Sequence, residues 1–343
     1  MLKIYIKICL LILVIFSSAN ELFAGGDKRN GTAGAQELLI PVGARGLALN
    51  GTNIADVEGI EAIYYNPAGL GFSKNSAQVM FSQMNYIADI GVSYAALAAN
   101  FGSFGSLAFS IKSVDFGDIP VTTVEAPEGT GSHFSPTFVT LGVTYSNALT
   151  DRIRVGVNVK LISEKIIRTS STGVAFDAGV QYSGIANISG LKLGVVLKNL
   201  GPPMKFDGPD LLRRADDVSA SRGEQFYKID AAGFELPSQL ELGLAYERTF
   251  MGSYKAIIST AYQNNNFAND EYKIGAEFNF NDFFYLRGGY SISEETNVDE
   301  NIFGPTFGAG INFKAGLDFT FDYAYRWARY FDANHVFAIK IGF

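Results

Sequence analysis

The sequence predicts an all-β transmembrane fold, a 14-stranded antiparallel β-barrel of the kind found in bacterial outer membranes. Apolar and polar residues alternate along most of the chain, most clearly at 153–161, 272–280 and 317–327. The segment 336–343 alternates in the same way and finishes on Phe343. The N-terminus has the charge, length and small-residue exit of a secretory signal peptide. Together these three observations favour a barrel that is exported and then inserted into the outer membrane.

The N-terminal segment has the three regions of a signal peptide. Lys3 and Lys7 precede an apolar run at 8–16, and cleavage is expected after Ala24, with Ala19 as the alternative. The apolar run is shorter than the roughly 20 residues that a membrane-spanning helix needs. We therefore expect this segment to be removed and not to anchor the protein.

Composition and the absence of known motifs exclude several classes of function. The chain is 48% hydrophobic and 13% aromatic, with 37 glycines and a formal net charge of −7, so nucleic acid is not an expected partner. Its one cysteine, Cys9, lies in the predicted signal peptide, which excludes disulfides and cysteine chemistry in the mature chain. His133 and His335 have no neighbours at metal-ligand spacing, and no nucleophile elbow or P-loop is present. We expect no catalysis, no metal and no cofactor.

The alternating segments number fourteen, an even count as a single-chain bacterial barrel requires. They are expected at 76–86, 90–100, 105–115, 136–147, 152–165, 172–183, 190–199, 237–248, 253–264, 269–280, 283–293, 304–314, 316–327 and 334–343. The expected domains are a signal peptide at 1–24, a preceding segment at 25–75 and the transmembrane barrel at 76–343.

Connection lengths support this strand count. The longest connections fall at 116–135, 200–236 and 294–303, after the third, seventh and eleventh strands. All three therefore lie on one side of the membrane, and short links such as 101–104 and 251–252 lie on the other. Long loops outside and short turns inside are typical of outer-membrane barrels.

A soluble sandwich or propeller is the alternative, because such proteins also alternate. It does not explain the signal peptide, the loop parity and the terminal aromatic residue together. Phe343 resembles the assembly signal that the bacterial barrel-assembly machinery reads. In a barrel, Phe337, Ile339 and Ile341 should face lipid with Phe343, and Lys340 should face the lumen.

The segment 25–75 does not alternate. Apolar and acidic residues between Ile54 and Ala62 have helical spacing and predict a short helix. Asn66-Pro67 is expected to end it, and Gly69 marks a turn.

This segment also resembles the N-terminal signature of the PorV/PorQ family, within the wider superfamily of the long-chain fatty-acid transporter FadL. The matching residues are Gly43, Ala44, Arg45, Asn66, Pro67, Ala68, Gly69 and Leu70. Asn50 and Thr52 stand where glycine and alanine are more usual in that family. The resemblance implies an N-terminal lumenal hatch that plugs the barrel from the periplasmic side. A plain turn leading into the first strand remains the alternative, because turn chemistry alone selects Asn-Pro.

Charged residues of both signs are predicted to line the lumen. They are Arg154, Lys160, Asp177, Glu241, Lys273, Glu277, Arg287, Asp318, Asp322, Arg326 and Lys340. Mixed signs indicate a salt-bridge lattice that supports the wall and holds the hatch, whereas a selectivity lining would carry one sign.

The long connection at 200–236 offers a candidate surface site for a hydrophobic ligand or a protein partner. Its apolar residues are Met204, Phe206, Leu211, Leu212, Phe226 and Tyr227. Packing of these residues over the barrel mouth is the alternative.

Two functions remain open for this non-enzymatic barrel. Likeness to PorV implies that it receives or hands over cargo at the outer membrane in type IX-like protein secretion. Likeness to FadL implies passive uptake of long-chain fatty acids or other hydrophobic compounds. The expected partners are outer-membrane lipid, the barrel-assembly machinery, and either secretion-system proteins or hydrophobic small molecules.

Overall fold

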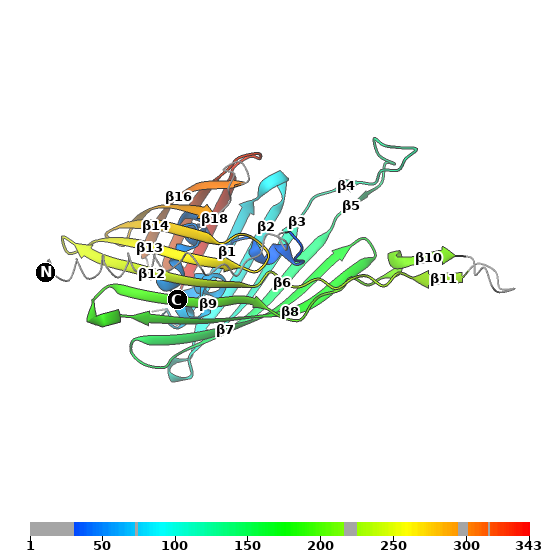
Figure 1. The fold of residues 1–343 in the computed structure, drawn as a ribbon. Coiled ribbons are helices and arrows are strands. Elements are labelled where there is room, and N and C mark those ends of the chain that lie inside the picture. The colour runs from blue at the N-terminus through cyan, green and yellow to red at the C-terminus, as the bar shows by residue number, and fades with distance from the viewer. Residues whose placement is uncertain (1–30, 73–74, 216–224, 294–300, 315) are drawn as a thin grey trace.

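The protein folds as a closed antiparallel barrel in the computed structural model (Figure 1). The structure describes residues 31–72, 75–215, 225–293, 301–314 and 316–343, so the predicted signal peptide lies outside the described residues. Neighbours around the wall are β1-β18-β17-β16-β15-β14-β13-β12-β9-β8-β7-β6-β3-β2. The wall strands are β1 (Ala77–Asn85), β2 (Gly91–Asn100), β3 (Ser106–Asp115), β6 (Thr137–Ala148), β7 (Ile153–Ile166), β8 (Thr169–Ser183), β9 (Leu191–Leu200), β12 (Gln239–Phe250), β13 (Tyr254–Asn265), β14 (Glu271–Phe280), β15 (Phe284–Ser293), β16 (Phe303–Lys314), β17 (Asp318–Ala328) and β18 (Asn334–Gly342).

The predicted fold class is confirmed. Each of these fourteen strands lies within three residues of its predicted bounds. The long connections β3–β6, β9–β12 and β15–β16 leave the same end of the barrel, because successive wall strands are antiparallel. We call this the outer end, since long loops are extracellular in outer-membrane barrels.

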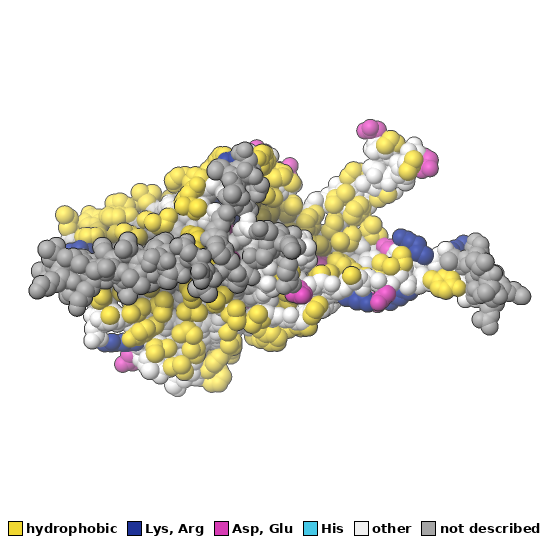
Figure 2. Space-filling view, viewed as in Figure 1, with side chains coloured by type: hydrophobic (Ala, Val, Ile, Leu, Met, Phe, Trp, Pro, Cys, Tyr) yellow, Lys and Arg dark blue, Asp and Glu magenta, His cyan; other side chains and the backbone are white. Residues whose placement is uncertain are grey.

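The outer face of the wall is apolar. Val157, Val159 and Leu161 of β7 are 49%, 42% and 46% exposed, while Asn158 and Lys160 between them are buried in the lumen. Hydrophobic side chains cover the barrel strands in Figure 2, and many of the charged side chains in that view lie on the projections beyond the outer end. A soluble barrel would not expose such a surface, so this face meets lipid.

The first and last wall strands close the barrel. β1 pairs with β18 from Gln78↔Gly342 to Asn85↔His335. The backbone of Phe343 continues this pairing, because its N–H donates to the Ala77 carbonyl at 2.9 Å.

The last strand presents the two faces that its alternation predicts. Phe337 and Ile339 are 48% and 47% exposed on the outside, whereas Ala338 is 1% exposed on the inside.

Residues 31–72 lie inside the barrel and form its core (Figure 1). We call them the lumenal segment. It consists of short turns: η3 (Gln36–Leu39), α2 (Ala44–Ala48), η4 (Thr52–Ala55), η5 (Gly59–Glu61), α3 (Ala62–Tyr65) and η6 (Pro67–Phe72). Ile54, Val57 and Ile63 are at most 2% exposed, so the segment is packed as tightly as the interior of a soluble domain. None of the helices among the described residues is long and apolar enough to cross a bilayer.

The predicted helix between Ile54 and Ala62 is wrong. The chain leaves η4 at Asp56, Glu58 is extended, and η5 begins at Gly59 with a positive φ of 68°. The ion pair of Asp56 with Arg45 and the conformation of Gly59 override the local helical spacing. The end of α3 at Asn66 agrees with the prediction.

Two hairpins extend from the outer end of the barrel (Figure 1). β4 (Ile119–Pro120) pairs with β5 (His133–Phe134), and β10 (Leu212–Ala215) pairs with β11 (Gln225–Lys228). The sequence predicted these stretches only as long loops, because each paired segment is too short to show alternation.

Candidate functional site

The Asn-Pro-Ala-Gly-Leu motif joins the lumenal segment to the wall. Asn66 is fully buried and donates from Nδ2 to the Ile54 carbonyl at 2.8 Å and to the Val180 carbonyl at 3.2 Å. Its Oδ1 accepts from the Ala68 N–H at 3.2 Å. A Cβ on Gly179 of β8 would lie 2.0 Å from this oxygen, so glycine is needed for the approach.

The residues after Asn66 also lie directly against the wall. A Cβ on Gly156 of β7 would lie 2.3 Å from the carbonyl carbon of Pro67. Ser146 of β6 donates to the Ala68 carbonyl at 2.9 Å. Gly69 must also lack a side chain, because a Cβ there would lie 2.1 Å from the Val57 carbonyl oxygen. The motif therefore anchors the segment by backbone contacts that few other residues could make. Leu70, the last residue of the motif, is buried in the core.

Gly43, Ala44 and Arg45 begin the second anchor. Gly43 has a φ of 79° and caps α2, whose Ala44 is fully buried. Arg45 projects toward β14 and contacts two carboxylates: Asp56 of the lumenal segment at 2.8 Å and Glu277 of β14 at 2.8 Å. One guanidinium therefore ties the segment to itself and to the wall.

The ion pairs continue around the wall from Glu277. Arg287 of β15 lies 2.6 Å from Glu277 and 2.5 Å from Asp322 of β17. Lys340 of β18 lies 3.0 Å from Asp322 and 3.1 Å from Glu61 of the lumenal segment. The chain of pairs thus begins and ends on the lumenal segment and passes through four wall strands. We call it the latch network.

Other predicted lumen charges form separate pairs. Lys160 lies 2.6 Å from Asp177, and Lys273 lies 3.3 Å from Glu271. Glu241 pairs with Lys198 of β9 at 2.8 Å.

The sequence analysis missed Lys198 and Glu271. Lys198 is two residues after Val196, which faces the lumen, so the alternation of the strand would have placed the Lys198 side chain in the lumen as well.

Three predicted lumen charges make no ion pair within the described residues: Arg154, Asp318 and Arg326. Arg154 stacks on Phe72 with its Cζ 3.1 Å from the ring centre. Asp318 accepts from Asn312 at 2.5 Å near the inner rim. The single lattice predicted from sequence is therefore divided into the latch network, isolated pairs and unpaired groups.

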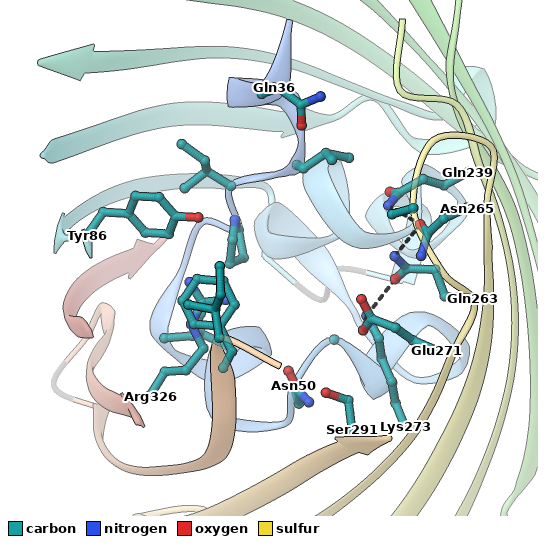
Figure 3. Close-up of a pocket in the computed structure, with 18 of the residues that line it drawn as sticks. Gln36, Asn50, Tyr86, Gln239, Gln263, Asn265, Glu271, Lys273, Ser291 and Arg326 are labelled. Atoms are coloured by element: carbon teal, nitrogen blue, oxygen red, sulfur yellow. Dashed lines mark hydrogen bonds and ion pairs between the residues drawn. The ribbon is translucent and has the colours of Figure 1, made fainter. Parts of the chain in front are cut away.

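A pocket of about 570 Å³ lies in the lumen at the outer end, between the wall and the lumenal segment (Figure 3). One side is apolar. It is lined by residues from strand ends and from the connections between strands, namely Tyr86, Ile90, Phe116, Phe138, Ile302 and Phe303. Phe116 and Phe138 pack edge to face with ring centres 4.8 Å apart. This side can bind a hydrocarbon surface.

The opposite side of the pocket is polar and comes mainly from β12 to β15. Its residues include Gln239, Gln263, Asn265, Glu271, Lys273, Ser291 and Ser293. In Figure 3 Gln239, Gln263 and Asn265 lie across the pocket from Tyr86 and Arg326. Gln263 donates to Asn265 at 2.8 Å and accepts from Lys273 at 2.5 Å, so this side is ordered by its own hydrogen bonds. Of the predicted lumen charges, Glu241, Lys273 and Arg326 line this pocket.

Glu37 lies at the edge of the pocket and is 3% exposed. Glu164 of β7 and Lys112 of β3 face it. Burial raises the pKa of the Glu37 carboxyl above its ordinary value. Lys112 instead donates to the Ile40 carbonyl at 2.8 Å.

The wall next to the pocket has a gap in its pairing. β15 and β16 pair from Phe284↔Ile311 to Gly289↔Thr306, and no pairing continues along the described residues beyond that point. Pro305 has no N–H to donate there. Ser291, Ser293 and Phe303, which border this unpaired stretch, all line the pocket. We call this stretch the β15–β16 seam.

The six residues of the predicted loop site do not form one site. Met204 is buried at the rim, and its backbone pairs with that of Phe234. Phe206 packs on Phe234 with ring centres 5.6 Å apart.

The rest of the loop site lies on or beside the β10–β11 hairpin. Leu211 precedes β10, and Leu212, Phe226 and Tyr227 are 42%, 64% and 45% exposed. Part of the loop therefore packs over the barrel mouth and part is free to contact a partner.

Solved structures that share this fold include a hydrocarbon channel and a toluene transporter. The CymD monoaromatic hydrocarbon channel is 12% identical over 89% of this chain and 98% of that chain, with a TM-score of 0.56. This is the FadL-like barrel fold. The Ralstonia pickettii toluene transporter TbuX gives 14% identity over 88% and 98%, with a TM-score of 0.55. A Pseudomonas aeruginosa FadL homologue gives 10% identity over 88% and 98%, with a TM-score of 0.53.

No protein-family model and no curated protein matches the sequence. The FadL-like fold and the apolar outer face together place this protein in the bacterial outer membrane. The resemblance to PorV and PorQ and the secretion role that it implies remain a hypothesis from sequence.

Proposed function

We propose that this protein is a non-catalytic outer-membrane channel for passive uptake of hydrophobic and amphiphilic organic compounds. The observation that carries the proposal is the pocket, which is open toward the outer end and has an apolar side lined by Tyr86, Phe116, Phe138 and Phe303. A pocket with aromatic walls is what a compound leaving water would occupy first. The FadL-like fold supports the proposal, since hydrocarbon channels and a toluene transporter share it.

The lumenal segment blocks a straight path from the pocket to the periplasm, because its core residues are fully buried against the wall. A bound compound then has two ways out. It passes the lumenal segment when that segment moves, or it leaves sideways through the β15–β16 seam. The seam borders the pocket and opens where the wall lacks pairing along the described residues. Lateral exit suits apolar compounds, which partition into lipid.

The segment 25–75 acts in this proposal as a hatch held by the latch network. Removing residues 25–70 should raise the small-ion conductance of the barrel in a planar bilayer, because the lumen would then be filled with water. An unchanged conductance would leave the segment as no more than a turn leading into β1.

Uptake can be tested with N-phenyl-1-naphthylamine, a hydrophobic dye that fluoresces once it passes an intact lipopolysaccharide-covered outer membrane. Cells that express the protein should admit the dye faster than cells with an empty vector. Ser291→Trp places an indole ring in the pocket and should reduce the increase, whereas Tyr290→Trp should retain it, because Tyr290 is 46% exposed on the outer side of the same strand. Equal rates for the wild type and Ser291→Trp, with both proteins correctly inserted, would refute the uptake function.

The secretion hypothesis predicts a different result. If this barrel receives exported cargo, a strain without it should fail to place type IX cargo on the cell surface. The exposed Phe226 and Tyr227 on the β10–β11 hairpin would be the surface to alter first. Normal cargo on the surface of the deletion strain would exclude this role.

A further inference from the structure

The pocket contains a buried cation that forms no ion pair with the residues that the structure describes. Arg326 of β17 is 6% exposed and lines the pocket. Its Nε donates to Asn334 at 3.1 Å, while its buried Nη2 makes no hydrogen bond within the described part of the chain. No carboxylate of the described residues forms an ion pair with it. Burying an unpaired guanidinium is unfavourable, so the arrangement is unexplained by folding alone.

Aromatic rings hold this guanidinium in place. Its Cζ lies 3.7 Å from the ring centre of Phe303 and 5.6 Å from that of Tyr86. Both rings belong to the apolar side of the pocket. Arg45 and Arg287 are arranged differently, since each contacts two carboxylates. Arg326 therefore presents a buried, fixed guanidinium to the pocket, the geometry of an anion-binding group.

A second unpartnered group lies elsewhere in the pocket. The Nδ2 of Asn50 is buried and has no hydrogen-bond partner in the described residues. Asn50 lies beside Ser291 in Figure 3, below the amide-rich side of the pocket. A compound that is apolar all round would leave both groups unsatisfied and would desolvate the hydrogen-bonding groups of Gln239, Gln263 and Ser293.

We propose that the ligand of this pocket is a two-faced organic acid of the pocket's size. Its carboxylate or similar oxyanion pairs with Arg326, and its apolar face lies against Phe116, Phe138 and Phe303. Its second edge carries hydroxyl or amide groups that bond to Asn50 and the polar side. The inference rests on the uptake proposed above and specifies its substrate class: neither a plain hydrocarbon nor a simple alkyl chain satisfies all three surfaces.

Cholate is a suitable probe, because it combines a carboxylate, an apolar face and a hydroxylated face. Binding of isotope-labelled cholate to the purified full-length protein in dodecyl maltoside would be measured by scintillation proximity. Two competitors would be compared with cholate. Cholate methyl ester lacks the negative charge, and lithocholate keeps the charge but lacks most of the hydroxyl groups. The wild type should bind cholate at least about 10-fold more tightly than either competitor, as expected for a charge-assisted bond and satisfied polar groups.

Variants assign this preference to the pocket. Arg326→Gln should remove the preference for the acid over its ester, and Arg326→Lys should restore part of it. Arg154→Gln is the matched control, because Arg154 is also stacked on an aromatic ring without an ion pair in the described chain but does not line the pocket. It should keep the wild-type preference. Unchanged heat-modifiable mobility on gels would show that each variant is folded.

Three results would overturn the inference: equal affinity of the wild type for cholate and its ester, an unchanged preference in Arg326→Gln, or no saturable binding of any of the three probes. The naphthylamine assay separates this failure from failure of the uptake proposal. Normal dye uptake without a preference for the acid would leave the channel and reject the substrate class. A preference for the acid without dye uptake would retain the binding site and reject the channel.

Discussion

Replacing Arg45 tests whether ion pairs hold the lumenal segment in the barrel. Arg45→Gln leaves the Asp56 carboxylate, whose side chain is 2% exposed, without its cation, while Glu277 keeps Arg287. Breaking a buried pair from one side costs about 3–5 kcal/mol. At about 1.4 kcal/mol per tenfold change, even the lower value raises the displaced population of the segment by about 100-fold.

Thiol labelling measures that population. The chain's one cysteine lies in the predicted signal peptide, so Thr52→Cys gives a single reactive site at a position that is 0% exposed. Its rate of reaction with a maleimide in the folded barrel reports how often the segment leaves the wall. We expect the rate to rise by about 100-fold when Arg45→Gln is added, in proportion to the displaced population.

Two controls separate the buried network from charge in general. Lys192→Gln removes a partly exposed cation that lies 3.7 Å from Glu58, and pairs of this kind contribute about 0–1 kcal/mol. It should change the labelling rate several-fold at most. Adding Asp56→Asn to Arg45→Gln should recover part of the loss, because the orphaned charge is then gone. A labelling rate in Arg45→Gln equal to that of the parent would refute the latch.

Three further substitutions test the anchors and the pocket. Gly179→Ala forces a Cβ to within 2.0 Å of the Asn66 side chain and should lower the free energy of unfolding in urea by about 1–3 kcal/mol. Gly288→Ala is the control and should be neutral, because the nearest atom to its Cβ would be 3.7 Å away. Asn66→Ala removes the hydrogen bonds to the Ile54 and Val180 carbonyls and from the Ala68 N–H, and should lower the free energy of unfolding in urea by about 1–3 kcal/mol. An unchanged unfolding free energy would contradict the anchoring role. Burial raises the pKa of the Glu37 carboxyl in the folded protein, so Glu37 contributes stability at acidic pH that is lost as the pH rises through the raised pKa. Glu37→Gln should therefore raise the thermal midpoint of unfolding near neutral pH and lose that advantage in acid. An equal gain in acid would show that the charge of Glu37 is not responsible.

The wall was predictable because its signal is local. Alternation in a strand such as β7 needs only neighbouring residues, and one lipid-facing side makes the period-2 pattern strong. The positions of the long loops, all on one side, then indicated the number of strands and which end of the barrel is extracellular. The motif from Asn66 was also visible in the sequence, because Asn-Pro and the following glycine constrain the chain locally.

The interior was less predictable because its contacts are distant in sequence. Nothing near Arg45 indicates that its partner is Glu277, 232 positions later. The helix expected after Ile54 fails because the Asp56 side chain is held by Arg45 and Gly59 takes a positive φ.

The apolar side of the pocket was missed for a different reason. Tyr86, Phe116 and Ile302 lie just beyond strand ends, where alternation no longer assigns a face.

The pairing of β1 with β18 also determines the order in which the barrel can form. The two strands are separated by nearly the whole described chain, so β1 remains an unpaired edge until all the other wall strands are in place. The lumenal segment contacts strands made much later, as when Thr306 donates to the Ala48 carbonyl at 2.8 Å. The growing wall must therefore wrap around a segment synthesised before it. Once the final edge closes, the segment is enclosed without any covalent bond, and its escape requires either its own partial unfolding or reopening of that edge.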